Sequence, residues 1–397
     1  MKIRSVTIFD GGGAMARRRE GIARAGKAAG VIKRRLTDAG FEVQTTRLAL
    51  APACCWIAEL DLAKSIEAAQ TIEKLANEAG LEYVSLGPVA VEAEHAGQIA
   101  KVPELIAATR AIFASVEINT STLRPTAEAI KKIGALTENG FGNLRFAALA
   151  CCQAGIPFFP AAYAAAGDFS CALASEGADL ALNALAEKQL PADAMNELSR
   201  RIEYNAGLIE KALAGVQEET GARFDGCDWS LATHPDPKCS IGAAIEKMTG
   251  APFGEWGTLS AIAALTSAVK RADVRHVGFS GVFLPMLEDV VLAKRTPQIR
   301  DLQQLLLYCS VCGSGLDTIP LAGDVSTDSI AALLGDVATL ALVLQKPLTA
   351  RLMPIPGLKE GESTRFDFPY LVNGQTMKLN GGGVKHWDDW YMGWILG

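Results

Sequence analysis

An α/β fold, with parallel strands separated by helices, is the class that the amino-acid sequence predicts. The chain has 397 residues, 49% of them hydrophobic and 21% charged, which is enough apolar material to bury a large core. Short apolar runs alternate with Ala-rich runs of helical periodicity, and this alternation favours parallel pairing through right-handed crossovers. No Pro-, Gly- or Ser-rich linker and no repeat of fixed period divides the chain, so we expect one domain over residues 1–397.

The first half of the chain has a regular alternation. Apolar runs predict strands at residues 4–9, 41–50 and 83–88, and helical spacing predicts helices at residues 21–40 and 60–80. The same alternation continues through residues 105–118, 126–139 and 143–151. A proline-containing stretch at residues 155–163 then predicts a rigid loop after a strand, the position at which α/β proteins place ligands.

The second half repeats this pattern with longer helices. Residues 167–177 resemble the strand and loop before them. Helical spacing predicts helices at residues 192–220, 240–249, 258–271 and 297–308, and short apolar stretches predict buried strands at residues 229–232, 277–280 and 349–354. The segment 381–397 differs, because three glycines precede His386, Trp387, Trp390, Tyr391 and Trp394. So much apolar area predicts that this tail docks on the body or on a second subunit, and we expect a homo-oligomer.

Charge and cysteine content limit the function classes. The net charge is −6, and the basic runs at residues 17–19 and 33–35 have helical spacing without interleaved aromatic residues, so we expect no nucleic-acid binding. The longest apolar run, residues 330–344, is interrupted by Asp336, so we expect no membrane span. The odd count of nine cysteines includes two adjacent pairs, which indicates reduced thiols. The first residues alternate as a strand and lack the features of a signal peptide, so we expect a cytoplasmic protein.

Two loops carry side chains suited to metal binding or proton transfer. His234, Asp236 and Cys239 lie within a few residues of one another beside two prolines, although their spacing matches no zinc motif and Ser240 equally suits a helix N-cap. Glu288 and Asp289 follow a predicted strand end and a glycine turn. These two acids could bind a hard cation or move protons, and they could equally begin a helix.

The stretch from Cys309 to Asp324 combines thiols, glycines and carboxylates, and its residues 313–323 are expected as a loop. Its glycines would permit close backbone approach to a ligand, and Asp317 supplies charge beside Cys312. A buried structural thiol is the alternative for Cys312. Farther along, Arg351 lies in an otherwise apolar strand and needs an anionic partner, either a protein carboxylate or a ligand. We therefore expect Arg351, Asp317 and Cys312 to converge on one concave site.

Several of these segments, in this order, resemble the domain of unknown function 711 family, also called uncharacterised protein family 0210. Residues 312–317 (C-G-S-G-L-D) with Pro320 resemble its C-S-V-G-L-D-M-I element, and residues 351–357 resemble R-I-I-P-x-P-G. Residues 280–285 with Glu288 and Asp289 resemble S-G-A-F-I-P-V-S-E-D, residues 377–380 resemble M-K-V-N, and residues 116–119 resemble S-V-N-I-G more weakly. The resemblance covers nearly the whole chain.

The resemblance implies a specific architecture. The family's fold is similar to the ten-stranded β/α barrel of pyruvate formate-lyase and other glycyl-radical enzymes, in which two parallel five-stranded half-sheets run antiparallel and loops carry active-site groups to the centre. This sequence has no R-V-x-G-aromatic motif near its C-terminus, so radical chemistry is not expected. Its Trp-rich end also differs from the G-G-x-I-P-A-P-I-H-S-like stretch typical of the family.

The leading functional hypothesis is a non-radical enzyme that acts on a small carboxylate-bearing or amino-acid-like metabolite in the barrel centre. Arg351 would bind the anion, Asp317 and Glu288 would move protons, and Cys312 would act as a nucleophilic or polarisable contact. Further candidate substrate-binding residues are Ser280, Gly281, Gly315 and Asn119. The alternatives are a small-molecule binding or sensory protein without turnover and a metal-dependent hydrolase or lyase built on His234 and Asp236. No cofactor can be named.

Overall fold

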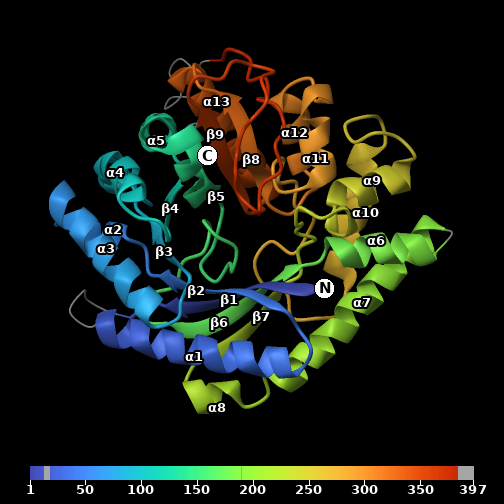
Figure 1. Ribbon diagram of the computed structural model, residues 1–397, viewed down its shortest axis with the longest axis horizontal. Coiled ribbons are helices and arrows are strands. Elements are labelled where there is room, and N and C mark those ends of the chain that lie inside the picture. Colours follow the sequence, from blue (N-terminus) through green and yellow to red (C-terminus); the bar gives the residue numbers. More distant parts are fainter. Residues whose placement is uncertain (13–17, 189, 383–397) are drawn as a thin grey trace.

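The computed structural model describes residues 1–12, 18–188 and 190–382. It has a mixed α/β architecture in which one curved nine-stranded sheet lies inside a surround of helices (Figure 1). The α/β class predicted from the sequence is therefore confirmed. The predicted tail segment, from residue 383 to residue 397, lies outside the described residues.

The strand order in the sheet is β7-β6-β1-β2-β3-β4-β5-β9-β8. The strands are β1 (Lys2–Asp10), β2 (Val43–Leu50), β3 (Tyr83–Pro88), β4 (Ile112–Glu117), β5 (Phe146–Ala150), β6 (Phe169–Glu176), β7 (Arg223–Asp228), β8 (Gly315–Ala322) and β9 (Leu348–Ile355). Strands β1 to β5 pair in parallel, as do β6 with β7 and β8 with β9. The β1–β6 and β5–β9 pairs are antiparallel. The alternation of strands and helices predicts only parallel pairs, whereas the family resemblance implies half-sheets of opposite direction.

The sheet is not closed, so a ten-stranded barrel is not shown. Its edge strands are β7 and β8. The segment 276–285 makes isolated parallel bridges on both sides, from His276 to Cys227 and from Pro285 to Asp317, without forming a continuous ladder. The sequence predicts a buried strand at residues 277–280. The segment 276–285 instead makes only these two bridges and a third, between Val282 and Leu231.

Helices cover the outer face of the sheet (Figure 1). The α-helices are α1 (Arg18–Asp38), α2 (Cys54–Ile57), α3 (Leu62–Glu78), α4 (Val102–Ala107), α5 (Leu123–Leu136), α6 (Ala178–Glu187), α7 (Pro191–Ala212), α8 (Val216–Thr220), α9 (Ile241–Thr249), α10 (Thr258–Arg271), α11 (Val290–Arg295), α12 (Leu302–Cys309) and α13 (Thr327–Leu344). Short 3₁₀ helices are η2 (Ala93–Lys101), η3 (Glu138–Arg145), η4 (Pro237–Cys239) and η5 (Thr296–Gln298).

Local sequence signals explain several helix boundaries. The hydroxyl of Ser240 accepts the N–H of Ala243 at 3.0 Å, so Ser240 is the N-cap of α9, as its position suggests. The helix predicted over residues 192–220 is instead two helices, because Gly215 adopts a left-handed backbone (φ 73°) between α7 and α8.

The loop expected at residues 313–323 is wrong, because these residues contain strand β8, which is buried from Gly315 to Leu321. Its glycines serve backbone packing against other strands. A Cβ at Gly315 would lie 2.3 Å from the carbonyl oxygen of Thr349, and one at Gly313 would lie 3.0 Å from Gly281. The glycines therefore allow close approach of the protein's own backbone.

Helix α13 is the one helix of the described residues that is long and apolar enough to cross a membrane by length and composition. Of this helix, 44% is buried, and it packs on α5, β5 and β9. These contacts are those of a helix that covers a sheet in a folded core.

The loop between β5 and β6, residues 151–168, crosses the concave inner face of the sheet, and Figure 1 shows it inside the ring of strands. The Thr7 hydroxyl of β1 donates to the carbonyl oxygen of Pro157 at 3.0 Å, and the Ser85 hydroxyl of β3 donates to that of Ala162 at 2.6 Å. These buried hydroxyls fix the loop in the centre of the molecule.

Candidate functional site

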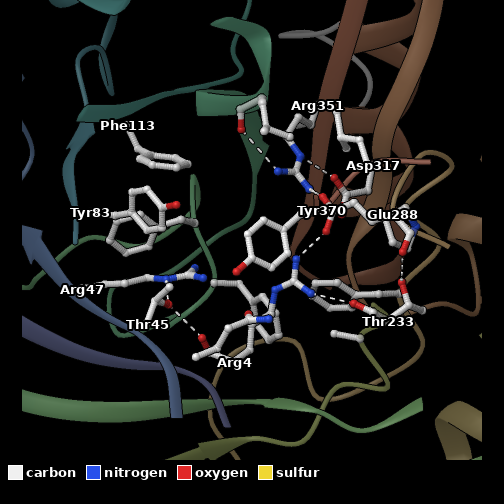
Figure 2. A pocket seen from close by; sticks show the side chains of 18 of the residues that line it. Arg4, Thr45, Arg47, Tyr83, Phe113, Thr233, Glu288, Asp317, Arg351 and Tyr370 are labelled. Atoms are coloured by element: carbon white, nitrogen blue, oxygen red, sulfur yellow. Dashed lines mark hydrogen bonds and ion pairs between the residues drawn. The ribbon is translucent and has the colours of Figure 1, made fainter. Parts of the chain in front are cut away.

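A cavity of about 100 Å³ lies between the two halves of the sheet. Its charged lining residues are Arg4 of β1, Arg47 of β2, Asp317 of β8, Arg351 of β9 and Glu288 (Figure 2). The remaining lining residues are Gln44, Thr45, Tyr83, Phe113, Leu144, Phe158, Phe159, Ala232, Thr233, Phe283, Pro285, Phe368, Tyr370 and Leu371. The cavity is therefore a polar site with aromatic walls.

The cavity lies at the amino ends of β1 to β4. Arg4, Tyr83 and Phe113 come from the first residues of β1, β3 and β4, and Arg47, in the middle of β2, pairs with Tyr83. In contrast, α/β proteins usually place ligands at the carboxyl ends. The antiparallel junctions explain this location, because β6 and β7 run in the opposite direction and end on the same side. The loop after β5 enters from the other side and contributes Phe158 and Phe159, so the ligand role expected for residues 155–163 fits the lining.

Four of the charged side chains form one buried network. Arg351 donates through Nε to Asp317 Oδ1 at 2.6 Å and through Nη2 to Glu288 Oε1 at 2.6 Å. The other carboxylate oxygen of Glu288 accepts from Nη2 of Arg4. Arg4 also donates to the carbonyl oxygen of Thr233 at 2.7 Å, so Glu288 bridges two guanidinium groups (Figure 2).

The pKa values of the two carboxyl groups in this network are shifted in opposite directions. Burial raises the pKa of Asp317, and the negative charge of Glu288 raises it further, although Arg351 opposes the change. Burial alone would also raise the pKa of Glu288, but Arg351 and Arg4 together hold it below its ordinary value. The difference arises because Glu288 has two guanidinium partners and Asp317 has one.

Arg47 lines the same cavity without an acidic partner. Its side chain is 8% exposed, and within the described part of the chain its guanidinium makes one hydrogen bond, from Nε to Thr45 Oγ1 at 2.8 Å. The guanidinium carbon also lies 5.6 Å from the ring centre of Tyr83 and 5.3 Å from that of Phe159. Burial first, and then the charge of Arg4, lowers the pKa of Arg47 to about 10.

Aromatic side chains form most of the cavity wall. Phe113 packs edge-on against Tyr83 at 5.3 Å and against Phe159 at 5.2 Å, measured between ring centres. Tyr370, which is 38% exposed, lies at the mouth and packs against Phe368 at 5.4 Å. The cavity is therefore apolar along its sides and charged at its ends.

The structure brings together three of the predicted site residues and separates Cys312 from them. Asp317, Glu288 and Arg351 share the ion network described above. Cys312 is 1% exposed and lies in the hydrophobic core, away from the cavity lining. Its sulfur accepts the N–H of Gly315 at 3.4 Å, and its pKa is lowered to about 7, first by Cys309 and then, against burial, by Lys346. The convergence expected for Cys312 is therefore not observed.

The four other substrate-binding candidates lie outside the cavity and have structural contacts. Ser280 accepts the N–H of Trp229 at 3.1 Å, and the side chain of Asn119 donates to Val91 O at 3.0 Å and accepts the N–H of Ser121 at 3.0 Å. Gly281 and Gly315 lie where a Cβ would meet backbone atoms of Gly313 and Thr349. These residues shape turns and strand contacts.

The two loops that were candidates for metal binding or proton transfer have different contacts in the structure. Asp289 accepts the N–H groups of Val291 and Leu292, so it caps α11, while Glu288 alone enters the ion network. Asp236 accepts the N–H of Lys238 as a cap of η4, and the ring of His234 packs against Tyr370 at 5.8 Å. Among the described residues, no three His, Cys, Asp or Glu side chains are grouped so that they could hold a metal ion.

Sequence reasoning missed Arg4 and Arg47. Both lie in strands that were predicted at residues 4–9 and 41–50 and that are largely buried. The rule that identifies Arg351, that a lone arginine in an apolar strand needs an anionic partner, applies equally to Arg47.

The fold and the cavity define an α/β protein with a buried, cation-rich pocket. The model of the family described as uncharacterised ACR, DUF711, matches residues 1–372, and the chain belongs to this family. The chain is 29% identical over 354 residues to a UPF0210 protein of Desulforudis audaxviator (82% of this chain, 77% of the relative). It is 30% identical over 343 residues to one of Pyrobaculum aerophilum (81% and 76%) and 25% identical over 406 residues to one of Listeria monocytogenes (96% and 90%).

Proposed function

We propose that this protein is a non-radical enzyme that acts on a small carboxylate-bearing metabolite bound in the central cavity. The observation that carries the proposal is the buried guanidinium of Arg47, which has no carboxylate partner among the described residues. A buried cation destabilises the fold unless an anion neutralises it, and a ligand carboxylate supplies that anion. Arg47 thus takes the anion-binding role suggested for Arg351, which already has two acidic partners.

Asp317 and Glu288 supply the proton-transfer groups in this proposal. Both line the cavity, and their pKa values move in opposite directions from the ordinary values. Neighbouring carboxyl groups that differ in this way are suited to act as an acid and a base. Asp317 donates a proton to the ligand, Arg351 stabilises the carboxylate that this leaves on Asp317, and Glu288 accepts a proton from the ligand. Cys312 has no part, because it lies in the core.

A binding or sensory protein without turnover is the second candidate. It is favoured by the ion pairs themselves, because Asp317 and Glu288 are both bound to Arg351 as structural acids are. The metal-dependent alternative gains no donor set from His234 and Asp236, whose neighbours among the described residues provide no third ligand.

We also propose that the sheet is the ten-stranded barrel implied by the family resemblance, with residues 276–285 as the tenth strand. Support comes from backbone hydrogen bonds on both sides of this segment. Val277 donates to Cys227 O at 3.2 Å on the β7 side, and Met286 donates to Asp317 O at 3.0 Å on the β8 side. With this strand, β1–β5 form one parallel half and β6, β7, residues 276–285, β8 and β9 form the other. Slow amide hydrogen exchange at Val277 and Met286 is the expected result, and exchange at loop rates would oppose it.

The test of function uses the full-length protein and its Arg47→Gln and Asp317→Asn variants. Each is incubated in D₂O with a cell extract of small metabolites, and bound and free molecules are identified by mass spectrometry and NMR. We expect the wild type to retain a carboxylate and to consume it or exchange its protons. Asp317→Asn should retain the same molecule without changing it, and Arg47→Gln should not retain it.

Each other outcome has a definite meaning. Retention by the wild type without chemical change or exchange would reject the enzyme and favour the binding protein. Equal retention of carboxylates by wild type and Arg47→Gln would show that Arg47 does not bind the ligand carboxylate. Circular dichroism and thermal melting of each variant would establish that the comparison is made between folded proteins.

A further inference from the structure

The charges and the aromatic walls of the cavity indicate more about the ligand than that it has a carboxylate. Its charged lining consists of three guanidinium groups, from Arg4, Arg47 and Arg351, and two carboxyl groups, from Glu288 and Asp317. Glu176, outside the lining, also pairs with Arg4 at 3.8 Å, so among the described residues the cation left without a carboxylate partner is Arg47. A site with this balance is neutralised by a ligand that has net negative charge.

No carboxylate of the lining is free to receive a ligand ammonium group. Glu288 is bound to both Arg4 and Arg351, and Asp317 is bound to Arg351 at 2.6 Å. An ammonium group placed in the cavity would lie among guanidinium groups without an anion of its own, a desolvated and repulsive position. The lining therefore disfavours zwitterionic amino acids.

The walls are suited to a flat apolar group. Tyr83, Phe113 and Phe159 form a continuous edge-to-face cluster beside Arg47, and Phe158 packs on Phe283 with 4.5 Å between ring centres on another wall. In Figure 2 the guanidinium of Arg47 lies beside Tyr83, on the opposite side of Tyr370 from the network of Arg351, Asp317 and Glu288. A ring that extends from Arg47 toward that network would contact aromatic faces and edges along its length.

We propose that the ligand is a monoanion in which one carboxylate is attached to an aromatic or similarly flat apolar group and no ammonium group is present, and that Arg47 selects it. This inference rests on the proposed carboxylate site and specifies its ligand class. The carboxylate binds the free N–H groups of Arg47, and the flat group lies between the aromatic walls. The opposite end of the ligand faces Asp317 and Glu288.

The test measures the affinities of four probes for the full-length protein by calorimetry or ligand-observed NMR. Phenylacetate has the ring and the single charge, and acetate lacks the ring. Phenylalanine adds one carbon that carries an ammonium group, and phenylacetamide replaces the carboxylate by a neutral amide of similar shape. We expect phenylacetate to bind about 10- to 100-fold more tightly than each of the other three, the range expected for loss of charge-assisted hydrogen bonds or of aromatic contacts.

A substitution separates the specific role of Arg47 from a structural one. In Arg47→Gln the preference for phenylacetate over phenylacetamide should disappear, whereas a general distortion of the cavity would weaken both probes equally. Arg47→Lys should keep part of the preference, because it keeps the charge and loses the fork geometry. Arg145→Gln is the control, since Arg145 is a buried arginine whose guanidinium binds carbonyl oxygens of Ile106 and Ile112 away from the cavity.

The outcomes distinguish this inference from the function on which it rests. If acetate or phenylalanine binds as tightly as phenylacetate and Arg47→Gln abolishes binding, the carboxylate site stands and the ligand class is wrong. If phenylacetamide binds as tightly as phenylacetate, or Arg47→Gln keeps the preference, Arg47 is not the selecting residue. If none of the carboxylates binds, the inference and the proposed site both fail.

Discussion

Arg351 and Glu288 form a buried ion pair with 2.6 Å between Nη2 and Oε1, and through this pair Asp317 is connected to Arg4. Arg351→Ala removes the shared cation and leaves the two carboxyl groups buried with one partner between them. We expect the free energy of unfolding to fall by about 3–5 kcal/mol. Urea unfolding at neutral pH, followed by circular dichroism, measures this change.

The matched control is Arg223→Ala. Arg223 also binds two carboxylates, Asp168 and Asp225, but its side chain is 53% exposed. Solvent screens that pair, so its loss should change the free energy of unfolding by about 0–1 kcal/mol. A cost for Arg351→Ala no larger than that for Arg223→Ala would mean that the central network does not stabilise the fold.

A second comparison tests whether Arg47 is unpaired. Arg47→Met removes a buried charge that has one hydrogen bond, so the ligand-free protein should be unchanged or stabilised by about 1–2 kcal/mol. Arg145→Met should instead destabilise by about 1–3 kcal/mol, because it leaves the carbonyl oxygens of Ile106 and Ile112 without their donor. Thermal and urea unfolding of both variants would measure whether each substitution raises or lowers the free energy of unfolding. Equal destabilisation by both substitutions would indicate that Arg47 has a protein partner.

The sequence predicts the helices and strands of this fold better than it predicts how the strands pair in the sheet. The strand predicted at residues 83–88 and the helix at residues 258–271 coincide with β3 and α10, because Gly87 and Pro88 mark the end of the first and Gly257 precedes the second. The antiparallel junctions β1–β6 and β5–β9 depend on contacts between distant segments, for which local periodicity contains no signal. Strand β8 was missed because Gly315 and the glycines beside the strand resemble loop residues, although Gly315 is needed where the backbone of Thr349 approaches.

Part of the site follows from charge alone. Arg351 and Asp317 are predictable partners, because neither group is stable when buried alone. The distinction between Glu288, which joins the network, and Asp289, which caps α11, is set by the direction of each side chain and cannot be read from two adjacent acids. Arg47 becomes informative only when its lack of a carboxylate is known, and that requires three-dimensional contacts.

Glu117 provides a test at the opposite end of β4. Its Oε1 accepts the N–H of Cys151 at 3.0 Å, and burial raises its pKa from 4.5 to about 8. Because the folded protein binds this proton more tightly than the unfolded chain does, stability should fall as pH rises from about 4.5 to about 8. Glu117→Gln keeps the acceptor and does not ionise.

We therefore expect Glu117→Gln to match the wild type in acid and to be more stable by roughly 3 kcal/mol above about pH 8, at about 1.4 kcal/mol per pKa unit with allowance for partial solvation. Urea unfolding of both proteins across this pH range measures the difference. A difference that is constant with pH, or that decreases as pH rises, would show that Glu117 is not a buried acid with a raised pKa.

The Trp-rich segment at residues 383–397 carries a prediction from sequence alone. Deleting it should change the mass of the assembly in light scattering, because three tryptophans and a tyrosine form an apolar surface suited to a subunit contact. Trp256, in the turn before α10, is 97% exposed and offers a comparison. An unchanged mass after the deletion, with a change after Trp256→Ser, would place the contact at that turn instead.

A crystal structure of the full-length protein grown with excess phenylacetate tests the central claim most directly. The account predicts density for the carboxylate within hydrogen-bonding distance of the Nη atoms of Arg47, with the ring between Tyr83 and Phe159 and the pair of Arg351 and Asp317 intact. The same experiment with Arg47→Gln should leave the cavity without this ligand. A cavity in which Arg47 is instead bound to a carboxylate of the protein itself, with no phenylacetate present, would contradict the claim.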